Sequence, residues 1–388
     1  MSDINNLISD ISKLCSNKET NIHTPKLTNK DLIYVKKALS ESNVSANGNE
    51  HSKFESKIKQ YTKSKNVVLV SNGSIALKLS LELLEIKRNS EVLLPSFNYI
   101  AAANAVIHHE AIPHFIEINN NFLIDADKLE KYLKKISILK NKKCINVKTG
   151  RHIQSIICLH NYGHICDMKK IKKITKKYNL KLIEDAAEAL GSFYKKKHAG
   201  TFGDIGILSF NGNKVLTTGG GGALLIPNRK IAIQAKKVIN HNKKNHSWKF
   251  IYEKSGYNFR LPNINAALGL GQILRIREII KQKNNLYLMY KKKLEKHKKI
   301  GYLLSEQKYQ NINFWLQVFV LKNKKNKEKI IKKLQSKKIF CRDTWTPLHK
   351  LSFMKKFPKM NMQVTNMLHD KSFNLPSGLD IYLRSKKK

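Results

Sequence analysis

The chain has 388 residues, 41% of them hydrophobic, which is enough for a sizeable core and too long for one simple domain. It has no run of about 18 apolar residues and does not start like a secretory signal, so we expect a soluble cytoplasmic protein without a membrane partner. The formal net charge is +45, but the lysines are spread from end to end without an aromatic-interleaved patch, which argues against nucleic-acid binding and favours a solvated basic surface.

Strand-like and helix-like segments alternate through the first two thirds of the chain. In chain order we expect strands at 66–70, 91–97, 114–118, 155–160 and 180–185, and helices at 74–86, 100–109, 125–136 and 167–179. This alternation predicts an α/β fold with a mostly parallel central sheet and helices on both faces. Ligands of such sheets collect at the carboxyl ends of the strands, so functional residues are expected there.

The alternation stops near residue 205. DIGILSF (204–210) and GALLIP (222–227) are two strands with no room for a crossover helix between them, which predicts a hairpin-like connection. A long helical pattern over 264–297 then leads to another strand, another helix and the terminal LPS. We therefore expect a smaller α+β C-terminal domain, and divide the chain into an N-terminal extension (1–24), a large domain (25–255) and a small domain (256–388).

Three features follow predicted strands. Gly73 and Ser74 join a strand to a helix start, where free N–H groups and the helix dipole can seat a phosphate, although Ser74 could equally be an ordinary N-cap. Asp185 closes an apolar strand, where a carboxylate must be capped, paired or solvated. Phe97 and Tyr99 end a third strand, and such aromatics either belong to the core or stack on a flat ring.

Lys214 lies in SFNGNKVLTTGGGG (209–222), after Ser209 and Asn211 and before four glycines that permit close backbone approach. The stretch is not a P-loop, because the lysine precedes the glycines and a strand follows them. A lysine, a buried carboxylate, a stacking aromatic and an anion seat are together the parts that pyridoxal 5′-phosphate requires. We therefore interpret Lys214 as the residue that binds the cofactor aldehyde, the alternative being one more surface lysine.

A possible metal motif, C-x-H-x3-H-x-C, is formed by Cys158, His160, His164 and Cys166, whose residue types suit zinc. Its first half lies on a strand that runs into a Tyr-Gly turn, so we favour no metal and expect His160 to face the same pocket as Asp185. The five cysteines include no C-x-x-C pair and predict no disulfide framework.

Taken in order, these motifs resemble the nucleotide-sugar aminotransferases of the DegT/DnrJ/StrS type, which have the fold-type-I architecture of pyridoxal phosphate enzymes. The resemblance runs from about Pro25 to the terminal LPS. It rests on VSNGSIALKLSL, EVLLPSFNYIAAANAV, HNYGHICDM, LIEDAAEALGSFYKKKHAGTFGDIGILSFNGNK, TTGGGG and GYNFRLPNINAALGLGQI. LLPSF, EDAAEALGS and TTGGGG look most like the branch that aminates UDP-linked 4-keto-6-deoxy-N-acetylhexosamines on routes to legionaminic acid or bacillosamine. The alternatives are a GDP- or dTDP-linked keto-sugar and, in another class, a non-catalytic basic protein on this scaffold.

The resemblance implies a role for each site residue. Lys214 would be the Schiff-base lysine and proton shuttle, and Asp185 would pair with the pyridine nitrogen. Asn258 would reach the phosphate of the neighbouring subunit's cofactor, which implies a homodimer with shared active sites. L-glutamate would be the amino donor and a nucleotide sugar the acceptor. The remaining cofactor residues would be Gly73, Ser74, Tyr99, Glu188, Ser209 and Asn211, and the substrate residues His160, Tyr257 and Arg260.

Three positions depart from the family pattern. Many relatives have Gln or His where this chain has Glu188, and an acidic residue where it has Gly220. Asn43 stands where the family usually has Trp, in the segment SNVSANG (42–48), which borders the sugar site. The identity of the sugar is therefore the least defined part of the prediction.

Overall fold

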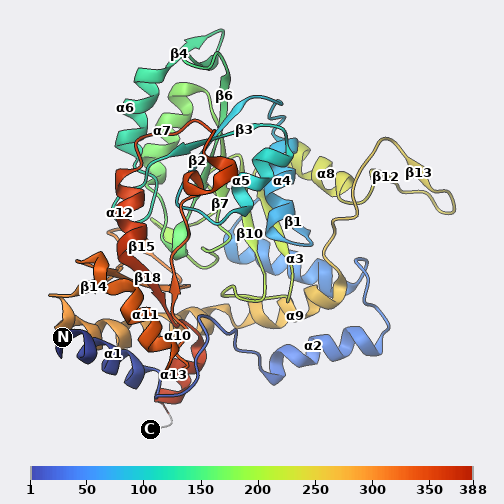
Figure 1. The fold of residues 1–388 in the computed structure, drawn as a ribbon. Helices are drawn as coiled ribbons and strands as arrows, with labels where there is room; N and C mark the ends of the chain where they lie inside the picture. The colour runs from blue at the N-terminus through green and yellow to red at the C-terminus, as the bar shows by residue number, and fades with distance from the viewer. Residues whose placement is uncertain (1, 387–388) are drawn as a thin grey trace.

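The computed structural model describes residues 2–386 and is built around a mixed sheet (Figure 1). The strand order is β1-β11-β10-β7-β6-β2-β3, and a hairpin, β4–β5, is attached to β6. All pairs from β10 to β3 are parallel, whereas β11 is antiparallel to both of its neighbours, as expected for the segment after residue 205. The strands are β1 (Asn66–Val70), β2 (Glu91–Pro95), β3 (Ile112–Ile116), β4 (Ser137–Lys140), β5 (Lys143–Asn146), β6 (His152–Leu159), β7 (Lys181–Asp185), β10 (Ile205–Ser209) and β11 (Gly222–Ile226).

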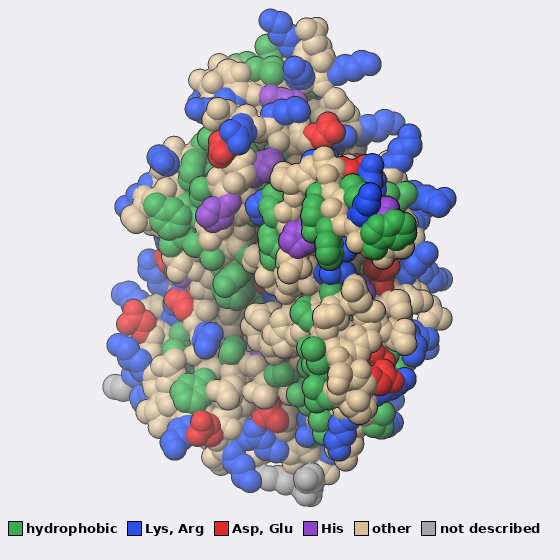
Figure 2. Space-filling view, turned by 90° about the vertical axis from the view of Figure 1, so that its right-hand side faces the viewer, with side chains coloured by type: hydrophobic (Ala, Val, Ile, Leu, Met, Phe, Trp, Pro, Cys, Tyr) green, Lys and Arg blue, Asp and Glu red, His purple; other side chains and the backbone are tan. Residues whose placement is uncertain are grey.

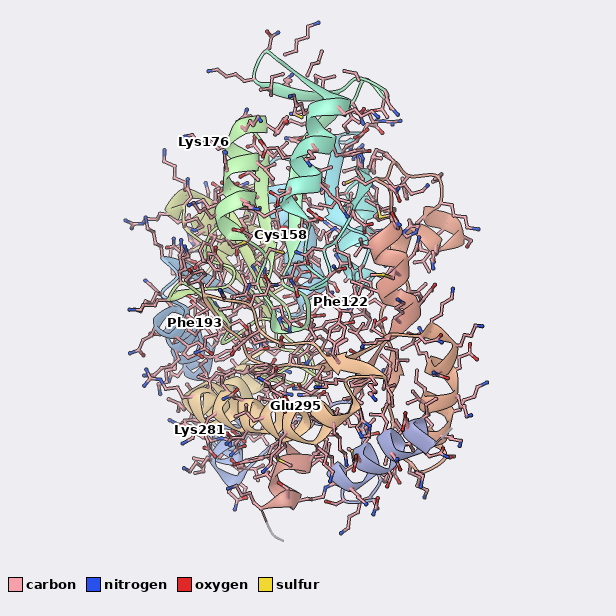
Figure 3. The ribbon with its side chains drawn as sticks, turned by 90° about the vertical axis from the view of Figure 1, so that its left-hand side faces the viewer. Phe122, Cys158, Lys176, Phe193, Lys281 and Glu295 are labelled. Atoms are coloured by element: carbon pink, nitrogen blue, oxygen red, sulfur yellow. The ribbon has the colours of Figure 1, made fainter. Side chains whose placement is uncertain are left out.

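Helices flank both faces of this sheet (Figures 1 and 3), so the central strands are buried along nearly their whole length and read as continuous apolar runs. Asp125 and Asp167 accept hydrogen bonds from backbone N–H groups in the first turns of α6 and α7, which fixes where these helices begin. The helices of this layer are α4 (Gly73–Leu83), α5 (Ala101–His108), α6 (Ala126–Ile136), α7 (Met168–Tyr178) and α8 (Arg229–Val238).

The helical pattern over 264–297 is broken at Arg275 into α9 (Asn263–Leu274) and α10 (Ile276–Leu294). Arg275 has φ −106° and ψ 6°, and its guanidinium lies 2.8 Å from the buried carboxylate of Asp31 on α2 (Asn29–Ser40). A Cβ at Gly271 would lie 2.6 Å from the Asp31 Cα, so this glycine lets α9 and α2 approach closely. The other neighbour of α9 is α3 (Asn49–Thr62). The single long helix expected from the sequence is thus wrong at one residue, Arg275, whose backbone leaves the helical conformation and whose side chain pairs with Asp31.

A second apolar core lies in the lobe that carries both chain ends (Figure 1). Leu7, Ile8 and Ile11 of α1 (Ser2–Leu14) pack there beside Tyr290 of α10 and Phe319 of β16. The N-terminal stretch expected as an extension therefore contributes a helix to the C-terminal core. The other elements of this lobe are β14 (Gly301–Leu303), β16 (Gln317–Leu321), α11 (Lys327–Gln335), β17 (Arg342–Asp343), α12 (Gln363–Lys371), β18 (Ser372–Leu375) and α13 (Leu379–Ser385). A small sheet of β15 (Gln310–Asn311), β8 (Phe193–Tyr194) and β9 (Lys197–His198) joins the lobes.

A hairpin of β12 (Lys243–Lys244) and β13 (Ile251–Tyr252) projects from the body of the molecule (Figure 1). Its Trp248 and Phe250 side chains are 78% and 76% exposed. Lysine and arginine side chains are scattered over the face in Figure 2 and do not gather in one patch. Among residues 2–386, no helix has the length and apolar character needed to span a bilayer.

Candidate active site

The predicted lysine lies at the carboxyl ends of the central strands, just beyond β10. Its side chain is 14% exposed, and its Nζ lies 3.8 Å from the Glu188 Oε1 and 3.9 Å from the ring centre of Trp315. The Trp315 Nε1–H donates a 2.7 Å hydrogen bond to the Asn213 carbonyl, so the same indole also fixes the backbone before the lysine. Lys214 is therefore a buried, positioned amine, unlike the many solvated lysines of the surface.

The charges around Lys214 shift one another's pKa values. Burial lowers the pKa of Lys214, and the nearby Glu188 and Asp185 carboxylates oppose that shift. Burial raises the pKa of Asp185, opposed by a hydrogen bond from the Ala187 N–H and by the charge of Lys214. Burial also raises the pKa of Glu188 to about 7, although Lys214 and the backbone N–H of Tyr162 favour its charged form. The lowered pKa of Lys214 favours its neutral amine, which is the nucleophilic form.

The expected anion seat is assembled where α4 begins. The N-cap is Asn72, whose Oδ1 accepts a 2.8 Å hydrogen bond from the Ile75 N–H, so the alternative of Ser74 as N-cap is wrong. Ser74 is exposed, and a Cβ added to Gly73 would lie 3.0 Å from the Ser209 Cβ. The structure therefore brings Gly73, Ser74 and Ser209 together around the positive end of a helix, an arrangement that suits a phosphate.

The glycine run after Lys214 has a packing reason. A Cβ at Gly222 would lie 2.7 Å from the Asn72 carbonyl carbon, so only glycine lets β11 pass this close to the start of α4. Gly219 has φ +78°, a left-handed conformation that also favours glycine. Asn211 precedes this run on the exposed side of the loop, and its N–H lies 3.5 Å from the Ser209 Oγ. The glycines thus hold the lysine loop against the anion seat.

The stacking residue predicted from the sequence, Tyr99, is 55% exposed and packs edge-on against Trp345, with ring centres 5.6 Å apart. Trp345 in turn stacks on Tyr162 at 6.1 Å, and the Tyr162 N–H donates to Glu188. Tyr99 is thus linked to the Lys214 site through aromatic side chains. The two tryptophans of the site could not be found from the sequence, because each lies more than 100 positions after the lysine or the tyrosine that it contacts.

His160 does not face the open site. It is fully buried, and its Nε2 lies 2.9 Å from the Glu184 Oε2, on the residue before Asp185. The Glu184 carboxylate also accepts hydrogen bonds from the backbone N–H groups of Gly200, Phe202 and Gly203. His160 therefore supports β7 from the buried side. The sequence led us to expect that His160 contacts the substrate, and its buried position does not fit that role.

Cys158, in the interior of Figure 3, and Cys166 lie beside His160, with the candidate ligand atoms of the three within 4.8 Å of one another. Burial lowers the pKa of His160, but Cys166 and Glu184 outweigh it and raise the value to about 9. Burial raises the pKa of Cys166, but Cys158 and His160 lower it to about 6. His164 is not part of the group, so the structure assembles three of the four residues of the possible zinc motif, already paired with one another and with Glu184.

The segment GYNFR (256–260) runs beside β1, where the Ser71 N–H donates to the Phe259 carbonyl. The Tyr257 hydroxyl lies 2.9 Å from the Lys78 Nζ and donates to Glu82, both on α4. Arg260 donates to the Asn47 side chain, which brings the segment 42–48 to this place, as expected for the border of the sugar site. Asn258 is exposed on the same segment. The side chains of Tyr257 and Arg260 are therefore engaged within their own chain, while that of Asn258 points to solvent.

Comparison with known proteins agrees with this geometry. The model of the DegT/DnrJ/EryC1/StrS aminotransferase family matches residues 25–385. The GDP-perosamine synthase of Escherichia coli O157:H7 is 32% identical over 92% of both chains, and the UDP-4-amino-4,6-dideoxy-N-acetyl-beta-L-altrosamine transaminase of Campylobacter jejuni serotype O:23/36 is 27% identical over the same shares. The fold is similar to that of Helicobacter pylori PseC, an aminotransferase involved in the biosynthesis of pseudoaminic acid, with a TM-score of 0.84, 22% identity and coverage of 95% and 99%.

The chain thus belongs to the DegT/DnrJ/EryC1/StrS aminotransferase family and has the fold-type-I architecture. It is a pyridoxal phosphate-dependent nucleotide-sugar aminotransferase. The residues fit the cofactor. Gly73 leaves room for a phosphate at the start of α4, and the buried Asp185 and the largely buried Lys214 lie at the same end of the sheet.

Proposed function

We propose that this enzyme transfers the amino group of L-glutamate to the C4 ketone of a nucleotide-linked 4-keto-6-deoxy sugar. The observation that carries the proposal is the buried Lys214, held between the Glu188 carboxylate and the Trp315 ring at the strand ends. Two relatives support this class of product, because one is a GDP-perosamine synthase and the other a transaminase named for a UDP-linked 4-amino sugar.

Each residue of the site has a distinct task in this reaction. Pyridoxal phosphate, when bound, supplies the aldehyde that carries the amino group and the ring that accepts the electrons of a broken C–H bond. The Lys214 Nζ would hold the cofactor and, once displaced, move the proton, a role that its lowered pKa favours. The Asp185 carboxylate accepts the N–H of the pyridine ring and keeps that nitrogen protonated. Gly73, Ser74 and Ser209 hold the phosphate.

The nucleotide is proposed to be UDP, on a 2-acetamido-2,6-dideoxy sugar, for legionaminic acid or surface-polysaccharide synthesis. The motifs LLPSF, EDAAEALGS and TTGGGG favour that branch. A GDP-linked sugar is the second candidate, because the relative with 32% identity is a GDP-perosamine synthase.

The test is to incubate the purified enzyme with L-glutamate and UDP-, GDP- and dTDP-linked 4-keto-6-deoxy sugars and to measure the mass of the product. Amination of the UDP-linked N-acetyl sugar alone supports the first candidate, and amination of the GDP-linked sugar replaces it by the second. A colourless protein that binds no pyridoxal phosphate and aminates none of them would support the non-catalytic alternative.

We also propose that the active enzyme is a homodimer in which Asn258 reaches the partner's phosphate seat. Two observations support this assembly. The exposed Asn258 lies beside β1, close in the chain to the projecting hairpin. That hairpin presents Trp248 and Phe250, which are 78% and 76% exposed, and large exposed apolar side chains mark contact surfaces. A two-fold assembly would bury the same aromatic surface on both subunits.

A further inference from the structure

A groove of about 610 Å³ lies where the lysine loop meets the C-terminal lobe. Its walls come from three parts of the chain: the stretch 21–25, the residue before Lys214, and the end of α11 with β17. The lining residues with polar side chains are Asn21, His23, Thr24, Asn213, Gln335 and Arg342, and no acidic residue in the described part of the chain lines it. The groove therefore has the size of a small-molecule site and a positive charge next to the catalytic lysine.

The positive charge comes from Arg342 and is not neutralised by its neighbour. Arg342 and Asp343 follow one another in β17, so their side chains point to opposite faces of that strand. The Asp343 carboxylate lies 2.8 Å from the Lys327 Nζ, away from the groove. Within residues 2–386, the exposed Arg342 guanidinium has neither an ion pair nor a hydrogen bond. It is thus a planar donor directed into a cavity without a protein acceptor.

His23 lines the same groove, and its neutral imidazole carries one N–H donor and one acceptor nitrogen. Its Nδ1 and Nε2 are both buried, and neither has a hydrogen-bond partner within the described residues. Burial lowers the pKa of His23, and the positive charges of Lys283 and Lys214 lower it further, which favours the neutral ring. Both nitrogens lie below the groove surface, so the ring forms part of the wall, and the exposed Arg342 and Asn213 are the donors that a ligand in the groove can reach.

We propose that this groove binds the anionic group of a substrate, with the Arg342 guanidinium donating to two of its oxygens and the Asn213 side chain completing the contact. The proposal rests on the proposed function, whose substrates offer two such groups: a carboxylate of L-glutamate and a phosphate of the nucleotide. Each offers two oxygens to the two parallel N–H donors of arginine, so the shared chemistry is an oxyanion beside the loop that carries Lys214.

The test compares Arg342→Gln and Arg342→Lys with Arg88→Gln, a control whose side chain is 75% exposed and pairs with Glu110 on the surface. The KM values for L-glutamate and for the accepted nucleotide sugar are measured separately. Calorimetry with glutarate, UDP and GDP on the cofactor-loaded protein gives binding without turnover. Loss of a bidentate charged contact should weaken the binding of one ligand by about tenfold to a hundredfold. Arg342→Lys should recover only part of that loss, because lysine keeps the charge but not the fork.

A raised KM for glutamate with weaker glutarate binding identifies a carboxylate site, and a raised KM for the sugar with weaker nucleotide binding identifies a phosphate site. The proposal is overturned if both Arg342 variants bind all three probes and use both substrates within twofold of the Arg88→Gln control. A wild-type enzyme without aminotransferase activity would instead count against the proposed function, and the calorimetry would still decide the groove.

Discussion

At the scale of single residues, environment separates one lysine from the chain's many other basic residues. The protein carries 73 Lys and Arg, so a lysine in this sequence is by itself no signal. Lys214 differs because it is largely removed from water and lies between a carboxylate and an indole ring. Desolvation favours its neutral form, and the neutral amine is the nucleophile.

Lys214→Ala is expected to abolish covalent attachment of pyridoxal phosphate and all aminotransferase activity, because no other described lysine lies beside Asp185 and Glu188. Borohydride reduction of the cofactor-loaded protein followed by peptide mapping should place the pyridoxyl label on Lys214. Lys230→Ala, on the exposed side of α8, should keep both label and activity. A label on any other lysine of the wild-type protein would refute the assignment.

Glu188→Gln is expected to change how stability depends on pH. Burial raises the pKa of Glu188 from 4.5 to about 7, so the folded chain holds this proton more tightly than the unfolded chain does. The resulting stabilisation is complete below about pH 4.5 and is lost as the pH rises through about 7. When the pH is raised from about 5 to about 7.5, the free energy of unfolding of the cofactor-free wild type should therefore fall by roughly 1–3 kcal/mol more than that of Glu188→Gln.

Urea unfolding at those two pH values measures the effect. Glu328→Gln serves as the control, because the Glu328 side chain is 83% exposed and its substitution should leave the wild-type pH dependence unchanged. Equal losses of stability in the wild type and Glu188→Gln would show that Glu188 is ionised in the folded protein throughout this range.

At the scale of elements, the site depends on how closely the start of α4 approaches β10 and β11. Gly73 faces Ser209 and Gly222 faces Asn72, each at a separation that a side chain would not allow. As a result of this approach, the free N–H groups at the start of α4 lie beside the hydroxyls of Ser74 and Ser209. Packing of two glycines thus produces the phosphate seat.

Gly73→Ala is expected to weaken pyridoxal phosphate binding by about tenfold, because the new Cβ would lie 3.0 Å from the Ser209 Cβ and push α4 away from β10. Spectroscopic titration of the cofactor-free protein measures the Kd. Gly212→Ala is the matched control, since its Cβ would meet nothing closer than 3.8 Å. Pyridoxal, which lacks the phosphate, should bind Gly73→Ala and wild type alike, and an equal loss for both ligands would show a general disruption of the site.

At the scale of the whole molecule, the two cores meet around the active site. Asp185 and Lys214 belong to the central sheet, whereas Trp315, Trp345 and Arg342 come from the C-terminal lobe. The hairpin aromatics Trp248 and Phe250 and the side chain of Asn258 are exposed in the single chain and are the basis of the proposed dimer.

Mixing Lys214→Ala subunits with Asn258→Ala subunits is expected to restore activity if active sites are shared. One site of each mixed dimer would then carry both lesions and the other neither, so random mixing of equal amounts should recover about a quarter of the wild-type activity per total protein. Each variant mixed only with itself is the control. No recovery, with mixed dimers demonstrated by a tag on one subunit, would mean that each site is built from one chain.

The sequence by itself determined the order and type of the central elements. Apolar runs such as NVVLV and LKLIED, separated by segments with helical periodicity, leave a parallel sheet as the arrangement that buries them. It also pointed to Lys214, Asp185, Gly73 and Ser209, because each lies at or just after the end of a predicted strand, where ligands of such sheets bind. These signals are local, and the structure brings the four residues to one edge of the sheet.

Only the tertiary structure decided which of two neighbouring side chains reaches the site. Glu184 and Asp185 follow one another at the end of β7 and point to opposite faces, and nothing in the sequence says that Glu184 takes His160 with it into the interior. Likewise, the Arg275 side chain at the break between α9 and α10 pairs with Asp31, more than 200 positions earlier. Contacts between distant positions follow from how the lobes pack, which residue spacing does not encode, and for that reason Trp315, Trp345 and Arg342 became visible only in the folded chain.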